Sequence, residues 1–482
     1  MSTAQPARNT ALPTTPPSRL GVTVMPEWFQ DEGIAAVLDR VQRIGAEAIA
    51  TSPYVLERVA QGDGAREPPP DGEAGKVRPL DRPLFGTTEL WVRTSPAFVH
   101  DTSRYAGLRY QPAPPTAVTH ANATLIDDVV AAATRRGLSV QLQVMAASPP
   151  GYRVQFSAAV AEDRCMGPDF LPHEARVDRN ASLASDAVGA YVEALLAELA
   201  QRYPGVAGFR LDWPEYPPYD LSSALFDFNP AAQALMEAAG HDPAQVAGAA
   251  RAWRLDARAR VASVITVDAA RIAAALAPAV DTLLAPHGPL AALFAAKRTA
   301  VRALLARCRR ALDAVPGPRR RLEPQAFPPP FHRLSGFPLD ALDGIADAVG
   351  MKLYTMHWPM IGRYWARDLV GSTDGPLADA TSVAIARRFG LLDALPGDAS
   401  SFRYPEPSQR HPAGADAQRD KFAAARAAAG AVPVIAFAHS YGPQDDVLAR
   451  LAIARDGGGP AWINRYGYLS DAKLAAMARH ET

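Results

Sequence analysis

Short apolar segments of strand length alternate with segments whose apolar residues recur at helical spacing. Residues 21–25 form the first apolar run, residues 32–44 repeat apolar side chains every three or four positions, and residues 48–51 form the second run. A strand, a helix and another strand in this order are the elementary unit of a parallel sheet. The pattern therefore predicts a parallel β/α fold from the first residues of the domain onward.

The same alternation continues to the end of the chain and yields eight expected strands. These strands are residues 21–25, 48–51, 138–145, 206–212, 320–327, 351–355, 432–438 and 461–464. Helical spacing between them predicts helices that include residues 125–136, 186–202, 339–349, 447–454 and 470–479. Eight strands alternating with helices predict an α/β protein with a (β/α)₈ TIM barrel. A doubly wound open sheet is the alternative, but no glycine-rich phosphate turn follows the first strand.

Three long segments interrupt the barrel pattern, at about residues 54–118, 146–180 and 230–315. The first is dense in Gly, Pro and charge and contains one expected strand, residues 89–93; the last is rich in alanine and reads as helices packed outside the core. Residues 1–18 are rich in Pro, Thr and Ala and are expected to form a disordered tail. Residues 19–482 are then a single barrel domain.

Charge and cysteine content exclude several classes of function. The 50 basic and 50 acidic residues cancel, which argues against a nucleic-acid or anionic-membrane partner. No apolar run has the length of a membrane span, and a cytoplasmic protein is expected. Cys165 and Cys308 match no metal spacing, so two buried thiols are expected, with one disulfide as the alternative. No metal or cofactor is predicted, and the oligomeric state is left open.

The end of the fourth expected strand carries the strongest chemical signal. In a TIM barrel the active site lies at the C-terminal ends of the strands, and this strand ends at Asp212. A carboxylate at the end of a buried strand is costly unless it is paired or used. Arg210 lies two residues earlier on the same face of the strand and is expected to pair with Asp212 and keep it ionised. A purely structural Arg–Asp pair is the alternative.

Two further carboxylates are candidates for a general acid. Glu215 follows the strand among aromatic residues, where burial would raise its pKa. Glu323 lies on the fifth expected strand, where a register slip of one residue would turn it out of the barrel.

Aromatic and imidazole side chains follow most of the expected strands. Aromatic faces pack against sugar rings, so with Arg210 they form the predicted substrate-binding set, although each could equally be core packing. They are Trp28, Trp213, Tyr216, Tyr354, His357, Trp358, His439, Tyr441 and Tyr466.

Residues 208–212, Gly-Phe-Arg-Leu-Asp, resemble the fourth-strand motif of the alpha-amylase clan. The resemblance implies a nucleophile at Asp212 supported by Arg210. Short motifs across the chain also look similar to uncharacterised glycosyl-hydrolase-like barrel proteins; these are residues 202–206, 216–217, 228–230, 240–243, 327–330, 351–354 and 465–468. The resemblance extends from about residue 20 to the C-terminus. The chain departs from the amylases at residues 437–441, which lack their His-Asp pair, and at Glu323, which is followed by Pro324.

The sequence thus predicts a glycoside hydrolase that acts on an oligo- or polysaccharide. Asp212 would be the nucleophile or general base, and Glu215 or Glu323 the acid. Because no partner acid for Asp212 is assured, a barrel that binds carbohydrate without hydrolysing it, or with different chemistry, is the main alternative.

Two other hydrolase classes are weaker alternatives. Residues 438–442, Ala-His-Ser-Tyr-Gly, resemble the nucleophile elbow of serine hydrolases, but few residues follow Ser440 and His480 is near the chain end. A metal-dependent hydrolase is disfavoured because the ten histidines form no metal-binding motif.

Overall fold

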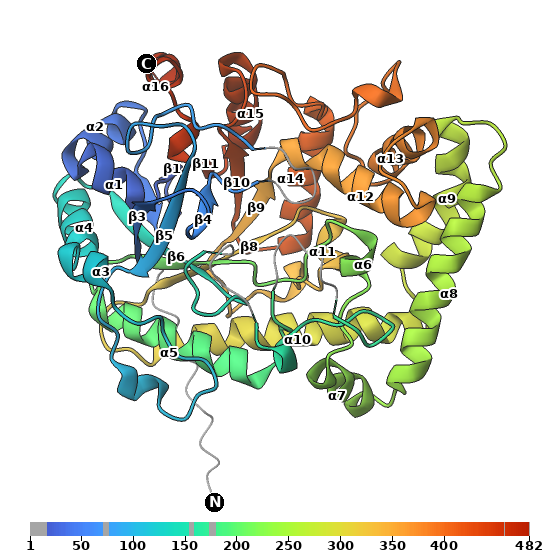
Figure 1. Ribbon diagram of the computed structural model, residues 1–482, viewed down its shortest axis with the longest axis horizontal. Coiled ribbons are helices and arrows are strands. Elements are labelled where there is room, and N and C mark those ends of the chain that lie inside the picture. Colours follow the sequence, from blue (N-terminus) through green and yellow to red (C-terminus); the bar gives the residue numbers. More distant parts are fainter. Residues whose placement is uncertain (1–16, 71–76, 154–158, 173–179, 457, 482) are drawn as a thin grey trace, which may run out of the picture.

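Eight parallel strands form a closed barrel in this protein, described by a computed structural model that covers residues 17–70, 77–153, 159–172, 180–456 and 458–481. Each strand pairs with the next along the chain and the last closes on the first, which confirms the predicted (β/α)₈ TIM barrel (Figure 1). The barrel strands are β1 (Leu20–Thr23), β2 (Ala48–Thr51), β6 (Ser139–Met145), β7 (Gly208–Asp212), β8 (Arg321–Ala326), β9 (Val349–Leu353), β10 (Val434–His439) and β11 (Ala461–Asn464). Every predicted barrel strand corresponds to one of these.

Helices surround the barrel and pack their apolar faces against it. In α5 (Asp186–Arg202), Val188, Leu195 and Leu199 are buried, and the Ser185 hydroxyl accepts a hydrogen bond from the Val188 N–H at 3.3 Å as the N-cap. The other α-helices that enclose the barrel, or lie in its loops, are α1 (Pro26–Glu32), α2 (Ile34–Arg43), α3 (Ala117–Ala121), α4 (Leu125–Arg135), α6 (Leu221–Ala224), α11 (Phe331–Leu334), α12 (Trp358–Val370), α13 (Pro376–Arg388), α14 (Ala415–Ala429), α15 (Gln444–Arg455) and α16 (Asp471–Glu481).

One predicted helix is wrong. Residues 339–349 contain only a 3-10 turn, Leu339–Ala341, and Val349 already begins β9. The apolar residues at helical spacing, Leu339 and Leu342, are buried in loop packing instead, and Gly344 adopts a φ of +71°, a left-handed conformation that ends any helix.

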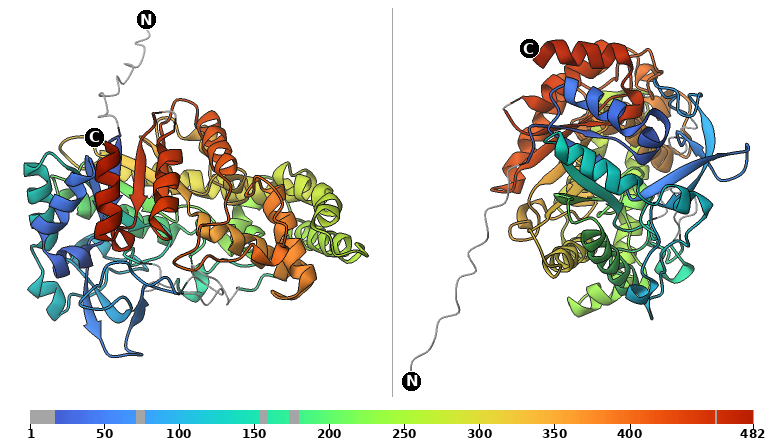
Figure 2. Two further views of the ribbon diagram at one scale, coloured as in Figure 1. Left: turned by 90° about the horizontal axis from the view of Figure 1, so that it is seen from above. Right: turned by 90° about the vertical axis from the view of Figure 1, so that its left-hand side faces the viewer.

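The first insertion forms a small sheet outside the barrel. Strands β3 (Tyr54–Val59), β5 (Leu90–Pro96) and β4 (Ala65–Glu67) pair antiparallel in that order, and β5 contains most of the predicted strand at residues 89–93. Figure 2 shows this sheet, in blue, projecting from the barrel. The predicted N-terminal tail lies almost entirely outside the described residues.

The insertion between β7 and β8 is helical, as predicted. It comprises α7 (Pro230–Ala238), α8 (Pro243–Ala262), α9 (Ala269–Leu284) and α10 (Gly288–Asp313). Helix α10 packs along α5, whereas α8 and α9 form a lateral extension with α12 and α13 (Figure 1). Among the described helices, none is by itself long and apolar enough to cross a membrane; α9 and α10, bent by 56° at their junction, meet that criterion only as a pair.

Aromatic rings fill the barrel interior opposite two glycines. Trp462 and Phe437 stack with ring centroids 6.3 Å apart. A Cβ atom at Gly21 would overlap the Trp462 ring, and one at Gly350 would overlap Phe437. These glycines are therefore required by the space that the rings occupy.

Gly21→Ala is accordingly expected to lower the free energy of unfolding by about 2 kcal/mol, because the added methyl group overpacks the barrel. Guanidinium unfolding monitored by circular dichroism measures the loss. Gly248→Ala in α8, whose nearest neighbouring atom would lie 4.0 Å from the new Cβ, is the matched control and is expected to stabilise by up to about 1 kcal/mol. Equal stability of the two variants would contradict the packing argument.

Candidate active site

Asp212 lies at the C-terminal mouth of the barrel, where β7 ends, and its side chain is 18 % exposed. Gln143 on β6 donates from Nε2 to Asp212 Oδ2 at 3.3 Å, and the Trp213 backbone N–H donates to Oδ1 at 3.0 Å. The Lys352 ammonium on β9 lies 3.4 Å from Oδ1. Two hydrogen-bond donors and a cation therefore surround the Asp212 carboxylate at the mouth.

Lys352, not Arg210, is the cationic partner of Asp212. The Arg210 guanidinium is fully buried inside the barrel, with its Cζ 3.3 Å from the Trp462 ring centroid, and it donates to Gln141 Oε1 at 2.6 Å. The predicted Arg210–Asp212 pair is wrong because Arg210 points one layer deeper, into the stacked rings. This depth also removes Arg210 from any surface that a substrate reaches. The only sequence signal for Lys352 is a single lysine inside the apolar run of β9.

Glu215 is the second carboxylate beside Lys352, whose Nζ lies 3.6 Å from Glu215 Oε1. The Phe327 N–H donates to Oε1 at 2.8 Å and the Ser335 hydroxyl donates to Oε2 at 2.7 Å. Burial raises the pKa of Glu215 to about 7, even though Lys352 and these donors act in the opposite direction. The raised pKa agrees with the prediction, but the side chain is fully buried beneath the mouth rather than exposed to a ligand.

The free energy of unfolding is expected to depend on pH through the titration of Glu215. Its pKa rises from 4.5 to about 7 on folding, so the folded state binds a proton that the unfolded state has lost between these values. The free energy of unfolding should therefore fall as pH rises from 4.5 to about 7, by about 3 kcal/mol, and the contribution of this group should be constant above that range. Glu215→Gln should remove this part of the fall.

Urea unfolding of the wild type and Glu215→Gln at several pH values measures the difference. Only the difference counts, because Asp227 and Glu27 are also buried carboxyl groups with raised pKa values and remain in both proteins. Parallel stability curves from pH 4.5 to 7 would show that Glu215 is ionised throughout.

Glu323 faces into the barrel, so the one-residue register slip that would have turned it outward does not occur. The side chain is buried, Arg321 Nε donates to its Oε1 at 2.7 Å, and it lies opposite Arg210 in the β7–β8 register. Two residues later on the same face, Gln325 donates to Gln143 Oε1 at 3.3 Å. At the level of the mouth β8 therefore contributes an amide, which places Glu323 below the position expected of a general acid.

Trp213, Tyr354 and His357 are the predicted aromatic residues that remain partly exposed. Trp213 adopts a φ of +54°, a left-handed conformation that costs a residue with a Cβ about 1–3 kcal/mol. Backbone strain of this kind directly after Asp212 is typical of a functional site. Tyr354 accepts a hydrogen bond from Asn464 Nδ2 at 3.0 Å, and its ring centroid lies 6.0 Å from that of His357.

The other predicted substrate-binding residues are buried and pack beneath the barrel mouth. Trp28 packs edge-on against Tyr466 at 5.6 Å, and the Tyr441 hydroxyl donates to the Pro405 carbonyl at 3.1 Å. Their burial corrects the expectation that they present a binding surface, because flanking loops pack over the strand ends. The buried residues of this set, besides Arg210, are Trp28, Tyr216, Trp358, His439, Tyr441 and Tyr466.

A buried charged cluster, which the sequence did not predict, joins the small sheet to the mouth. Tyr54 donates to Glu27 Oε2 at 3.1 Å, and Arg153 NH1 lies 3.7 Å from Glu27 Oε1. Arg153 also pairs with Glu67 on β4, and Arg465 NH1 lies 3.9 Å from the other Glu67 oxygen. Burial raises the pKa of Glu27, and Arg153 opposes that rise. The cluster fixes the insertion against the strand ends.

The serine-hydrolase alternative does not fit the geometry. Ser440 is fully buried and its hydroxyl donates to the Arg465 carbonyl at 2.5 Å. His439 Nδ1 accepts from the Tyr441 N–H at 3.1 Å, so this nitrogen is not directed at Ser440. The His480 side chain lies outside the described part of the chain. The Ser440 hydroxyl is therefore bound to a backbone carbonyl and is not activated as a nucleophile by His439.

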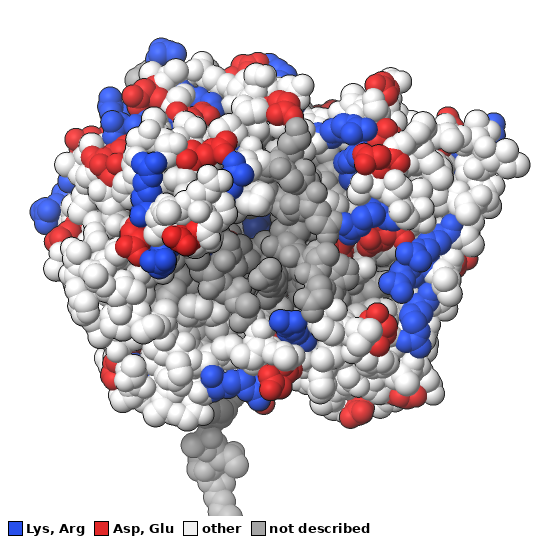
Figure 3. Space-filling model, viewed as in Figure 1, with Lys and Arg blue, Asp and Glu red and all other residues white. Residues whose placement is uncertain are grey.

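Cys165 and Cys308 are both buried and are not joined to each other, which agrees with the prediction. Within the described ranges, no three or more His, Cys, Asp or Glu side chains are grouped as a metal ion would require. Figure 3 shows basic and acidic residues interspersed over the described surface of one face.

No protein-family model and no curated protein sequence matches this chain. Among solved structures, a β-galactosidase from the psychrophilic Marinomonas ef1 is 11% identical with a TM-score of 0.49, over 96% of this chain and 58% of that one. The catalytic domain of a β-amylase from Paenibacillus polymyxa is 10% identical with a TM-score of 0.47, over 95% and 94% of the two chains. A β-galactosidase from Rahnella sp. R3 is 11% identical with a TM-score of 0.41, over 96% and 57%.

This chain spans somewhat more than half the length of the two β-galactosidases, at 58% and 57%. The similarity is to glycosidase barrels at very low identity, and it assigns no activity or catalytic residue to this chain.

Proposed function

We propose that the protein is a glycoside hydrolase that acts on an oligo- or polysaccharide at the barrel mouth, with Asp212 as its catalytic carboxylate. The observation that carries this proposal is the setting of Asp212, a partly exposed carboxylate that Lys352, Gln143 and the Trp213 N–H contact at the barrel mouth. A nucleophile or cation stabiliser for glycosidic cleavage needs such a group. Trp213 and Tyr354 offer partly exposed rings on which a sugar can pack.

Glu215 is the better supported of the two candidate acids. Lys352 Nζ lies 3.4 Å from Asp212 Oδ1 and 3.6 Å from Glu215 Oε1, so these two oxygens are at most about 7 Å apart, close enough for the two carboxyl groups to act on one glycosidic bond. The pKa of Glu215, raised to about 7, suits a proton donor. Because Glu215 is fully buried, protonation of the leaving oxygen requires its hydrogen bonds with Phe327 and Ser335 to open.

The same burial favours a second candidate function, a barrel that binds saccharide without hydrolysing it. Glu215 and Glu323 are both buried; the Ser335 hydroxyl donates to Glu215 Oε2, and Arg321 Nε donates to Glu323 Oε1. Such a protein would keep the aromatic mouth and the Asp212 carboxylate but would lack a proton donor in reach of the ligand.

Release of reducing ends from soluble α- and β-linked glycans distinguishes the two functions. The hydrolase proposal expects release by the wild type and its loss in Asp212→Asn. Binding of the same glycans by both proteins, with no release by the wild type, would establish the second function instead.

A further inference from the structure

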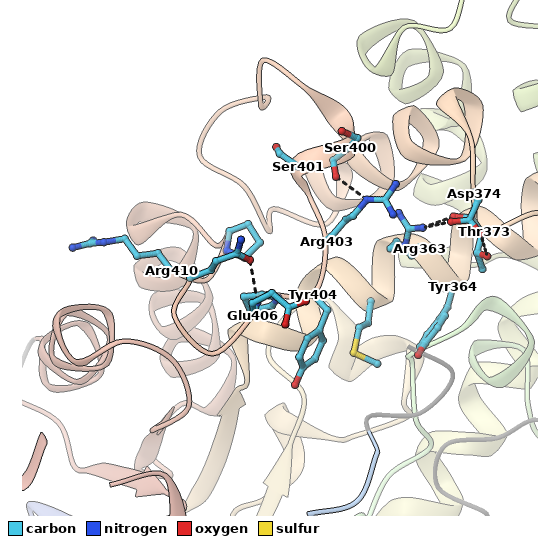
Figure 4. A pocket seen from close by; sticks show the side chains of 14 residues that line it. Arg363, Tyr364, Thr373, Asp374, Ser400, Ser401, Arg403, Tyr404, Glu406 and Arg410 are labelled. Carbon is cyan, nitrogen blue, oxygen red and sulfur yellow. Dashed lines mark hydrogen bonds and ion pairs between the residues drawn. The ribbon is translucent and has the colours of Figure 1, made fainter. Parts of the chain in front are cut away.

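A cavity of about 730 Å³ lies beside the mouth, between α12 and the loop of residues 400–412. Met360 and Tyr364 on α12 line one side, and Ser401, Tyr404 and Gln409 on the loop line the other. Figure 4 shows the side chains of Tyr364 and Tyr404 pointing to the same side. The volume lies within the range of about 300–1,000 Å³ that is typical of small-molecule sites.

A row of rings connects this cavity with Asp212. Trp213, the next residue, lies 5.9 Å from Tyr219 between ring centroids. The Tyr219 hydroxyl lies 3.1 Å from His357 Nδ1, and the His357 ring lies 6.4 Å from that of Tyr404. Helix α12 begins directly after His357, so it leads from the mouth to the cavity. This row of neighbouring rings therefore links the wall of the cavity with the candidate site.

The charges around the cavity are compensated within the protein. Arg363 NH1 lies 2.9 Å from Asp379 Oδ1, and Arg403 NH2 lies 3.1 Å from the same oxygen. Arg410 pairs with Asp445. In Figure 4 dashed lines join Arg363 to Asp374 and Arg403 to Ser400, and both guanidinium groups lie away from Tyr404. The lining therefore offers rings, hydroxyls and an amide to an uncharged ligand.

We propose that this cavity is a distal sugar-binding subsite, so that the substrate is a neutral oligosaccharide long enough to reach from Asp212 past His357 to Tyr404. Trp213 and Tyr354 would pack against sugar units at the mouth. In the cavity, whose lining exposes only the edges of Tyr364 and Tyr404 (4% and 9% exposed), a sugar unit would contact those ring edges, with Gln409 and the oxygen of Ser401 as hydrogen-bonding groups of the lining. The inference rests on the proposed saccharide function and adds the length and the neutral charge of the substrate.

The test measures binding, in the Asp212→Asn background, of malto-, cello- and β-1,4-manno-oligosaccharides of two to six units by isothermal titration calorimetry. Adding Tyr404→Ala is expected to weaken binding of the longest member of the recognised series about tenfold, and binding of the two-unit member much less. Tyr404→Phe, which keeps the ring, should stay close to the parent protein. Oligogalacturonates serve as the charged comparison and are expected to bind no better than the neutral chains.

Tyr364→Ala tests the opposite wall of the cavity, in case Tyr404→Ala fails to fold, and circular dichroism melting checks both variants. An equal loss at every chain length, no loss, or tighter binding of the charged chains would overturn the subsite. Tyr404-dependent binding of long chains, together with no reducing-end release by the wild type, would refute hydrolysis and leave the subsite standing. Absence of binding by every chain would overturn both.

Discussion

Asp212→Asn is expected to lower kcat/KM for glycan hydrolysis by about three orders of magnitude while saccharide affinity stays within a few-fold of the wild type. Asparagine keeps the shape of the side chain but is neutral, so it neither attacks the anomeric carbon nor stabilises a developing cation. Its amide oxygen can still accept hydrogen bonds from Lys352 and the Trp213 N–H, whereas its NH2 group cannot accept the hydrogen bond from Gln143. The loss should therefore appear in the chemical step, which reducing-end kinetics and calorimetric binding measure separately.

Asp39→Asn is the matched control for this substitution. Asp39 lies on α2 with a side chain that is 60 % exposed and pairs with Arg136. The control should retain the activity of the wild type. A fully active Asp212→Asn protein would remove Asp212 from the mechanism, whatever the fate of the control.

The second large effect is expected at Lys352, the ammonium group between two carboxylates. Its side chain is 4 % exposed, and Lys352→Met would leave Glu215 buried beside Asp212 without a cation. Removing one partner of a buried pair is expected to lower the free energy of unfolding by about 3 kcal/mol at pH 7. The pKa of Glu215 should rise further above about 7, because Lys352 now lowers it. The loss should shrink toward pH 4, where Glu215 is protonated and no longer needs the cation.

A double-mutant cycle separates this electrostatic effect from lost packing. Nζ of Lys352 also lies 4.7 Å from the ring centroids of Trp213 and Phe327, so methionine preserves much of the apolar contact. In Lys352→Met/Glu215→Gln the uncompensated charge of Glu215 is absent, and the double variant should lose less stability than the sum of the single changes. Additive losses that do not change with pH would show that Lys352 acts through packing alone.

Local pattern determined the parts of the fold that depend on near neighbours in the chain. The alternation of apolar runs with helical spacing predicted all eight barrel strands because a buried parallel strand is apolar on both faces. It failed at residues 339–349, where buried Leu339 and Leu342 pack as a loop and Gly344 turns the chain. Helical spacing over so short a segment indicates which residues are buried, but it does not determine the backbone conformation.

Asp212 could be assigned to the barrel mouth from sequence because strand direction alone places the end of a parallel strand at that face. The raised pKa of Glu215 followed equally well from the apolar residues near it in the chain. These two properties depend on the immediate sequence around β7.

Tertiary structure alone decided which groups surround Asp212. Closure of the barrel brings Lys352 from β9 to within 3.4 Å, whereas Arg210, its neighbour on the same strand, stacks on Trp462 one layer below. The depth of a side chain in the barrel and the loops that cover it likewise decided which aromatic residues stay exposed: Trp213 does, and Trp28 does not. Such contacts join residues far apart in the chain, and no local pattern encodes the distance between them.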